Sequence, residues 1–126
     1  MAARERVICD SAALAEGGLG VRFALGGEPG VPGGFAVRHG GVVHAFVNRC
    51  PHMGTELDWQ PGEFFEATGL YLVCATHGAL FQPDTGSCVA GPCRGAALDR
   101  LRTREYNGQV LLLNDAGPAS SPDETP

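Results

Sequence analysis

The sequence predicts an all-β domain of short antiparallel strands, with a loop-rich insert between residues 48 and 93. Glycine occurs 19 times and proline nine times in 126 residues, and both residue types interrupt helices. The apolar runs between them are short and bounded by turn-forming residues, as strands are. Gly40-Gly41 and Asn107-Gly108 each stand between two such runs, and these residues accept the positive φ of tight hairpin turns.

The expected strands follow from these short apolar runs. In chain order they are residues 7–9, 21–25, 35–38, 42–47, 70–74, 79–81, 98–104 and 109–113. Residues 11–19 hold either one short helical turn or a loop. Residues 26–34 are rich in glycine and proline, so they are expected to form a loop that separates the second strand from the first hairpin.

The later elements are defined by turns and spacing. Residues 84–86 (Asp-Thr-Gly) are expected to turn the chain after the strand at 79–81. Leu98 and Leu101 are three residues apart, which suits a helix, but the stretch is short and lacks a cap, so a strand is predicted. Residues 115–126 consist mainly of Ala, Gly, Ser, Pro and acidic residues. We therefore expect a single domain over residues 1–114, followed by a disordered tail.

Composition and charge exclude several classes of partner. The net charge of −5 and the pI of about 5.2 argue against a nucleic-acid partner, which usually meets a basic surface. No stretch approaches the roughly 20 apolar residues of a membrane span, and no apolar core follows the N-terminus, so a cytoplasmic protein is expected. The insert carries four acidic residues that either steer a basic partner or form a solvated face, namely Glu56, Asp58, Glu63 and Glu66.

The five cysteines are an odd number without a secretion signal, which argues against a disulfide framework and favours metal ligands. Cys88 and Cys93 form either a local pair or two free thiols, and the sequence leaves this open. Cys9 is expected to pack in the core as part of the first strand. His39 and His44 flank the first hairpin turn and are expected on the surface.

Two short motifs each combine one cysteine with one histidine. One residue separates Cys50 from His52, and two residues separate Cys74 from His77. Each motif follows an expected strand and enters a loop, so two loops can present four ligands to one metal centre. Thiolates are soft donors that suit iron and sulfide, and imidazoles also bind iron. Zinc takes two Cys and two His as well, but its sites commonly begin with two closely spaced cysteines, which favours iron here.

With the residues that follow them, the two motifs resemble the Rieske [2Fe–2S] ferredoxin family. The resemblance runs from about residue 7 to residue 113 and includes Gly78 and the Gly91-Pro92 pair. It implies a Rieske-type antiparallel β sandwich with a small loop-rich cluster-binding subdomain. It also implies one [2Fe–2S] cluster with two Cys and two His ligands, which are Cys50, His52, Cys74 and His77.

In this family the cysteines hold the inner iron and the histidines the outer iron at an exposed tip. The respiratory and photosynthetic members also have a disulfide between the two loops, but Thr55 and Thr76 occupy those places here. High-potential members place hydroxyl groups near the cluster, where this chain has Ala79 and Phe81. Fewer hydrogen bonds to the sulfurs stabilise the reduced state less, so a low reduction potential is expected.

The resemblance implies a one-electron carrier between a flavin reductase and a terminal oxygenase of the ring-hydroxylating type. Both partners would dock at the tip that holds His52 and His77. We expect no catalytic site of its own, because a chain of this length has no room for the mononuclear iron domain of an oxygenase. Two alternatives stay open: the small Rieske subunit of an assimilatory nitrite reductase, and a zinc-stabilised structural module. We expect a monomer, and the sequence does not identify the redox partners, the pathway or the substrate.

Overall fold

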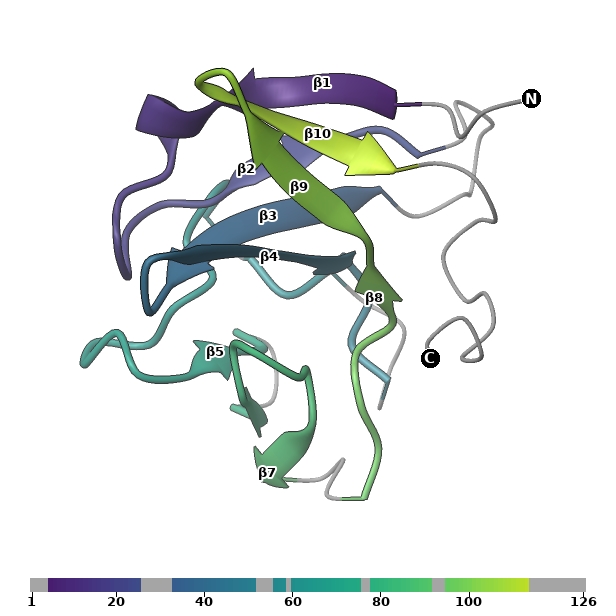
Figure 1. Cartoon of the computed structure of the whole chain (residues 1–126). Coiled ribbons are helices and arrows are strands. Elements are labelled where there is room, and N and C mark those ends of the chain that lie inside the picture. The colour runs from purple at the N-terminus through teal and green to yellow at the C-terminus, as the bar shows by residue number, and fades with distance from the viewer. Residues whose placement is uncertain are drawn as a thin grey trace.

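The computed structural model describes residues 5–25, 33–51, 56–58, 60–75, 78–91 and 95–113, which form ten strands and one 3-10 turn without an α-helix (Figure 1). The turn is η1 (Ser11–Ala13). The strands are β1 (Glu5–Asp10), β2 (Val21–Phe23), β3 (Gly34–His39), β4 (Val42–Val47), β5 (Leu72–Val73), β6 (Leu80–Phe81), β7 (Cys88–Ala90), β8 (Arg100–Leu101), β9 (Thr103–Tyr106) and β10 (Gln109–Leu113). All pairings between these strands are antiparallel, which confirms the predicted fold class.

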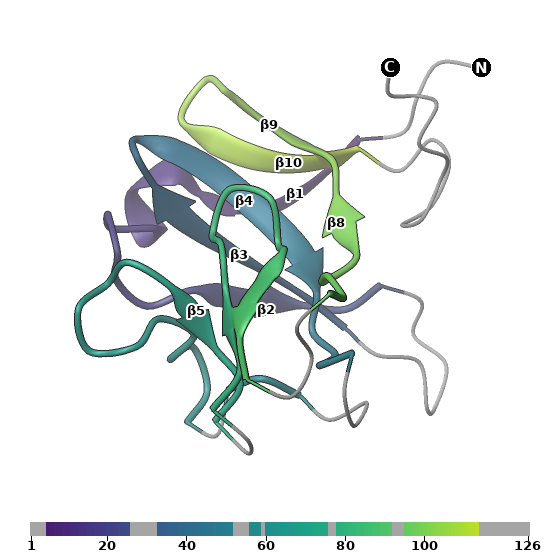
Figure 2. The same ribbon diagram turned by 90° about the horizontal axis from the view of Figure 1, so that it is seen from below.

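The strands form three sheets that lie in layers. The first sheet has the order β1-β10-β9, the central sheet β2-β3-β4-β8 and the small sheet β5-β6-β7. Figure 1 shows the first sheet above the central sheet and the small sheet below it. Seen from below, the small sheet lies in front of β3 and β4 (Figure 2).

The central sheet is buried on both faces because its apolar side chains alternate. Ala36 and Ala45 contribute to the core shared with the first sheet, which also contains Val110. Phe35 and Phe46 point to the opposite face and contribute to the core shared with the small sheet. Successive residues of a strand point to opposite faces, so β3 and β4 each contribute to two cores. The first sheet and the insert therefore pack against opposite faces of the central sheet.

Aromatic contacts hold the insert against the central sheet. The ring of Phe64 stacks on that of Phe35 with a centroid distance of 3.9 Å and an interplanar angle of 9°. Phe46 lies 5.8 Å from Phe35 in a tilted arrangement. All three side chains are fully buried, so the segment before β5 is fixed to β3 and β4 by apolar packing.

Most of the expected elements are confirmed. Both predicted hairpin turns are present, with positive φ at Gly40, Gly41, Asn107 and Gly108. The predicted strand at 98–104 is two strands, β8 and β9, interrupted at Arg102. β7 was not predicted, because a three-residue strand gives no periodic signal in the sequence. The predicted tail at 115–126 lies outside the described residues.

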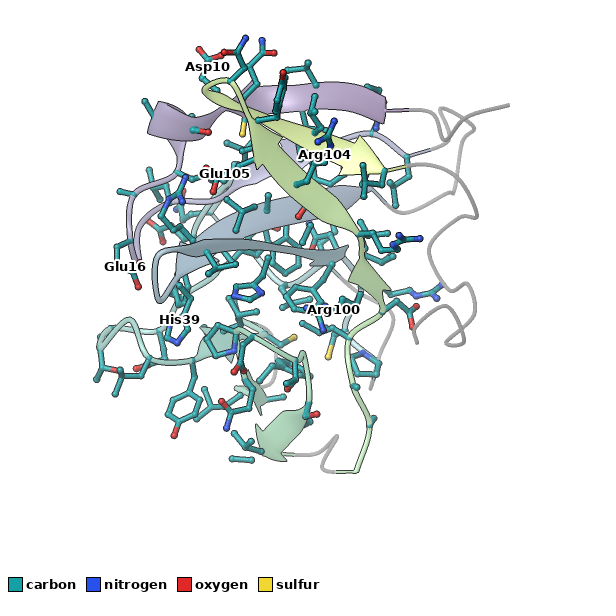
Figure 3. All side chains as sticks on the ribbon, viewed as in Figure 1. Asp10, Glu16, His39, Arg100, Arg104 and Glu105 are labelled. Atoms are coloured by element: carbon teal, nitrogen blue, oxygen red, sulfur yellow. The ribbon has the colours of Figure 1, made fainter. Side chains whose placement is uncertain are left out.

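The expectation that His39 and His44 lie on the surface is met only in part, because both are half-buried. His39 stands at the end of β3 and points toward the segment that carries Phe65, and the two ring centroids are 6.3 Å apart (Figure 3). His44 lies two residues before Phe46 on β4 and shares its face of the central sheet. Burial, followed by the charge of Arg100, lowers the pKa of His44, while Asp84 acts in the opposite direction.

In the described residues, no helix is long and apolar enough to cross a membrane.

We expect His44→Gln to flatten the pH dependence of stability just below pH 6.5, the ordinary pKa of histidine. In that range the unfolded chain takes up a proton at His44, whereas the folded chain does not until the pH falls to the lowered pKa. Stability is therefore complete above about pH 6.5 and falls through this window as the pH drops. Urea unfolding at several pH values measures the slope.

Glu105→Gln is the control, because Arg38 lowers the pKa of Glu105 from 4.5 and its effect lies at lower pH. An unchanged slope in His44→Gln would contradict the prediction.

Candidate metal centre

The two cysteines of the predicted motifs lie in the same buried core. Cys50 follows β4 and Cys74 follows β5, and both are fully buried in the core between the central and small sheets. His52 and His77 lie outside the described residues, so their placement stays a prediction. The structure therefore places the two thiols, which are distant in the sequence, in one core beneath the central sheet.

Both cysteine segments pass from the core to the surface within one residue. Cys50 is buried and Pro51 is exposed, and Cys74 is buried and Ala75 is exposed. The chain returns inward between Gly78, which is exposed, and Ala79, which is fully buried. The thiols thus lie at the inner side of two segments whose next residues face solvent.

The second segment is closed by backbone hydrogen bonds at its base. The N–H of Cys74 donates to the carbonyl of Ala79 at 2.9 Å, and the N–H of Gly78 donates to the carbonyl of Cys74 at 2.7 Å. Gly78 has a φ of +74°, a conformation that side chains rarely adopt. These bonds fix the direction in which the chain leaves and re-enters the core around Cys74.

A further backbone bond links the second segment to the chain that follows Cys50. The N–H of Ala75 donates to the carbonyl of Leu57 at 2.9 Å. Leu57 is fully buried and belongs to the same core as Cys50 and Cys74. The spacing of the two cysteine segments therefore depends on where Leu57 is held.

A third segment packs against the second one just after β7. A Cβ atom built on Gly91 would lie 2.7 Å from the Cα atom of Ala79, so the two backbones are too close for any side chain at this position. Pro92, which was expected to lie over the cluster together with Gly91, is outside the described residues. The part of this segment that is described contacts Ala79, five residues after Cys74.

The remaining thiols differ in their surroundings. Cys88 is buried in the same core as Cys50 and Cys74, and its thiol donates to the carbonyl of Ala90 at 3.3 Å. Cys9 packs against the other core, as predicted, and burial together with the charge of Asp10 raises the pKa of its thiol. A raised pKa keeps this thiol protonated, which disfavours metal binding. Cys93 lies outside the described residues, so its pairing with Cys88 stays open.

The acidic residues of the insert are not a uniform solvated face. Asp58 is 6% exposed and accepts hydrogen bonds within the core, whereas Glu56 is exposed and pairs with Arg22 at 2.6 Å. Glu66 accepts hydrogen bonds from Thr68 that lower its pKa. The burial of Asp58 was missed by the sequence analysis, because a carboxylate between apolar neighbours is typical of a solvated loop, and its partner Asn48 lies ten residues earlier in the sequence.

Comparison with known proteins identifies the family. Residues 5–107 match the family model of the Rieske [2Fe–2S] domain. Among solved structures, the chain is similar to one in the complex of reduced oxygenase and oxidized ferredoxin in carbazole 1,9a-dioxygenase, with a TM-score of 0.71, 20% identity, and coverage of 88% of this chain and 94% of that one. No curated protein matches.

Two further solved structures share the fold. Similarity to the Sphingomonas yanoikuyae B1 ferredoxin gives a TM-score of 0.70 at 21% identity, over 88% of this chain and 99% of that one. Similarity to the terminal oxygenase of carbazole 1,9a-dioxygenase from Novosphingobium sp. KA1 gives a TM-score of 0.68 at 26% identity. The oxygenase match covers 93% of this chain but 31% of that one, so this chain corresponds to about a third of the oxygenase.

We expect Gly91→Ala to destabilise the fold more than Gly95→Ala. Both glycines have a positive φ, +99° and +93°, so each substitution carries a similar backbone strain of about 1–3 kcal/mol. Only the Cβ atom at position 91 meets Ala79, and this overpacking adds about 1–3 kcal/mol. At position 95 no atom of the described residues lies within 4 Å. Chemical denaturation measures the free energy of unfolding of both variants. An equal decrease in the two variants would show that the added Cβ atom at position 91 does not collide with Ala79.

Proposed function

The chain belongs to the Rieske [2Fe–2S] domain family, and from this premise we propose that it is a one-electron carrier between a reductase and a terminal oxygenase. The observation that carries the proposal is the pair of fully buried thiols, Cys50 and Cys74, in one core at the point where two segments reach the surface. Family membership brings a [2Fe–2S] cluster with Cys and His ligands, which takes up and releases one electron at a time when bound.

The residues present fit such a cluster. Thiolates bind iron strongly, and burial of Cys50 and Cys74 keeps water from their sulfur atoms. We assign these two cysteines to the inner iron, and His52 and His77 to the outer iron. The exposed positions directly after each cysteine support this assignment, because both histidines follow their cysteines within three residues.

An electron carrier suits this chain for two reasons. The fold matches that of the Sphingomonas yanoikuyae B1 ferredoxin over 99% of that chain. A similar chain occurs in a complex of an oxygenase with a ferredoxin. The net charge of −5 favours docking to a basic surface, and we place this docking at the tip that carries His52 and His77.

The surroundings of the thiols favour a low reduction potential. Ala79 and Phe81 are fully buried in the core that contains Cys50 and Cys74, and neither side chain can donate a hydrogen bond. Hydrogen bonds to the sulfurs stabilise the reduced form, so their absence at these two positions lowers the potential.

We therefore expect a midpoint potential toward the low end of the Rieske range, about −150 mV, in a spectroscopic redox titration. Ala79→Ser adds one hydroxyl group beside the cysteine core and should raise the potential. Ala97→Ser adds the same group at an exposed position and should leave the potential unchanged. A wild-type potential above zero would contradict the prediction.

The direct test of the proposed function is electron paramagnetic resonance of the dithionite-reduced protein. A rhombic signal with an average g value near about 1.9 is expected for mixed Cys and His ligation. Cys50→Ser should abolish this signal. Cys88→Ser, which changes a buried thiol of the same core, should retain it. A colourless protein with bound zinc, or an equal loss of signal in both variants, would overturn the assignment.

A further inference from the structure

Two buried polar side chains lie beside the cysteine core and have no part in the proposed ligand set. Among the described residues, Asn48 is 2% exposed and Asp58 is 6% exposed, and these are the buried polar or charged side chains. Burying a carboxylate or an amide costs free energy unless its hydrogen bonds are satisfied. We therefore expect both side chains to have hydrogen-bond partners inside the protein.

These two side chains bind each other and the backbone of the insert. The Asn48 side chain accepts a hydrogen bond from the N–H of Leu57 at 2.9 Å and donates one to Asp58 at 3.1 Å. The second carboxylate oxygen of Asp58 accepts the N–H of Gly62 at 2.9 Å and lies 3.6 Å from Arg22 Nε. The pair thus satisfies two backbone N–H groups of the insert and is itself satisfied.

The hydrogen bonds continue from this pair to the second cysteine segment. Asn48 lies two residues before Cys50, and its amide holds the N–H of Leu57. The carbonyl of Leu57 accepts the N–H of Ala75, the residue after Cys74. A short series of hydrogen bonds thus connects the residues beside the two buried thiols through Leu57.

We propose that Asn48 and Asp58 are positioning residues that set the spacing of the two cysteine segments. This proposal rests on the proposed function, because the spacing matters only if both segments ligate one cluster. Such a cluster is retained only while the two segments stay at the correct distance. Neither residue is assigned as a ligand. A buried hydrogen-bond network that is fully satisfied specifies one arrangement of the chain, whereas a partly satisfied one does not.

The direction of the hydrogen bonds permits an exchange of the two side chains as a test. In Asn48→Asp, two carboxylates face each other. In Asp58→Asn, the NH₂ group of the new amide faces another hydrogen-bond donor, either the Asn48 amide or the N–H of Gly62. In the double variant N48D/D58N, the carboxylate at position 48 accepts from Leu57 and from the amide at position 58, whose oxygen accepts from Gly62. All three hydrogen bonds are restored, so the exchange should rescue the hydrogen-bond network that each single variant loses, while the carboxylate near Arg22 is replaced by an amide.

The experiment measures amide hydrogen exchange at Ala75 by mass spectrometry, together with the rate of iron loss to a chelator, on the full-length holoprotein. Each single variant should raise both rates by about tenfold, the change expected for one lost buried hydrogen bond. The double variant should return both rates close to those of the wild type. Val110→Ala, in the core on the other face of the central sheet, should lower thermal stability without changing either rate under native conditions.

The outcomes separate this proposal from the proposed function. A wild-type protein without the rhombic resonance signal would refute the electron-carrier assignment and, with it, the role in cluster retention. A wild-type protein with the signal, but with Ala75 exchange in the single variants no faster than in Val110→Ala, would refute the positioning role alone. If Asn48→Asp does not fold, Asp58→Asn and the double variant decide the question, and failure of the double variant to restore the two rates would overturn the proposal.

Discussion

Burial of the central sheet on both faces is the constraint on which the rest of the structure depends. Ala36 faces the first sheet while its neighbour Phe35 faces the insert, so the same strand is needed by both cores. On β3 and β4, the alanines Ala36 and Ala45 face the first sheet, and the phenylalanines Phe35 and Phe46 face the insert. The stack of Phe64 on Phe35 provides that anchor. A small sheet of two- and three-residue strands would be marginal by itself, and the central sheet supplies the surface that stabilises it.

The insert in turn needs polar contacts that apolar packing cannot supply. Its backbone is irregular, and the N–H groups of Leu57 and Gly62 are satisfied by buried side chains rather than by a neighbouring strand. Arg22 on β2 adds a charged contact to Asp58 from the edge of the central sheet. Apolar packing therefore attaches the insert to the sheet, while the hydrogen bonds of Asn48 and Asp58 fix the position of the insert relative to Cys50. This need for polar contacts explains why Asn48 and Asp58 are buried beside an apolar core.

The sequence predicted those features that depend on local chemistry. The hairpin turns were predicted because tight turns require positive φ, which Gly40-Gly41 and Asn107-Gly108 adopt readily. The two Cys and His motifs indicated a metal centre because their ligand types and order are specific. The half-buried position of His44 was not predictable, because it depends on the small sheet covering the central one. The strand at Cys88–Ala90 has three residues, which are too few to give a periodic signal. The burial of Asp58 was missed because it depends on tertiary contacts, including the hydrogen bond from Asn48, ten residues earlier in the sequence.

The change from buried to exposed positions at both cysteine segments matters for electron transfer. A carrier needs a cluster shielded from water on the protein side, because burial and hydrogen bonding set the potential. It also needs an exposed edge, because a partner has to approach the cluster closely. Cys50 and Cys74 are fully buried, while Pro51 and Ala75 are exposed, so both requirements are met within one step of the chain. In the proposed ligand set, His52 and His77 follow these cysteines by two and three residues, so the order of cysteine before histidine in each motif would run from the buried core toward the proposed docking surface.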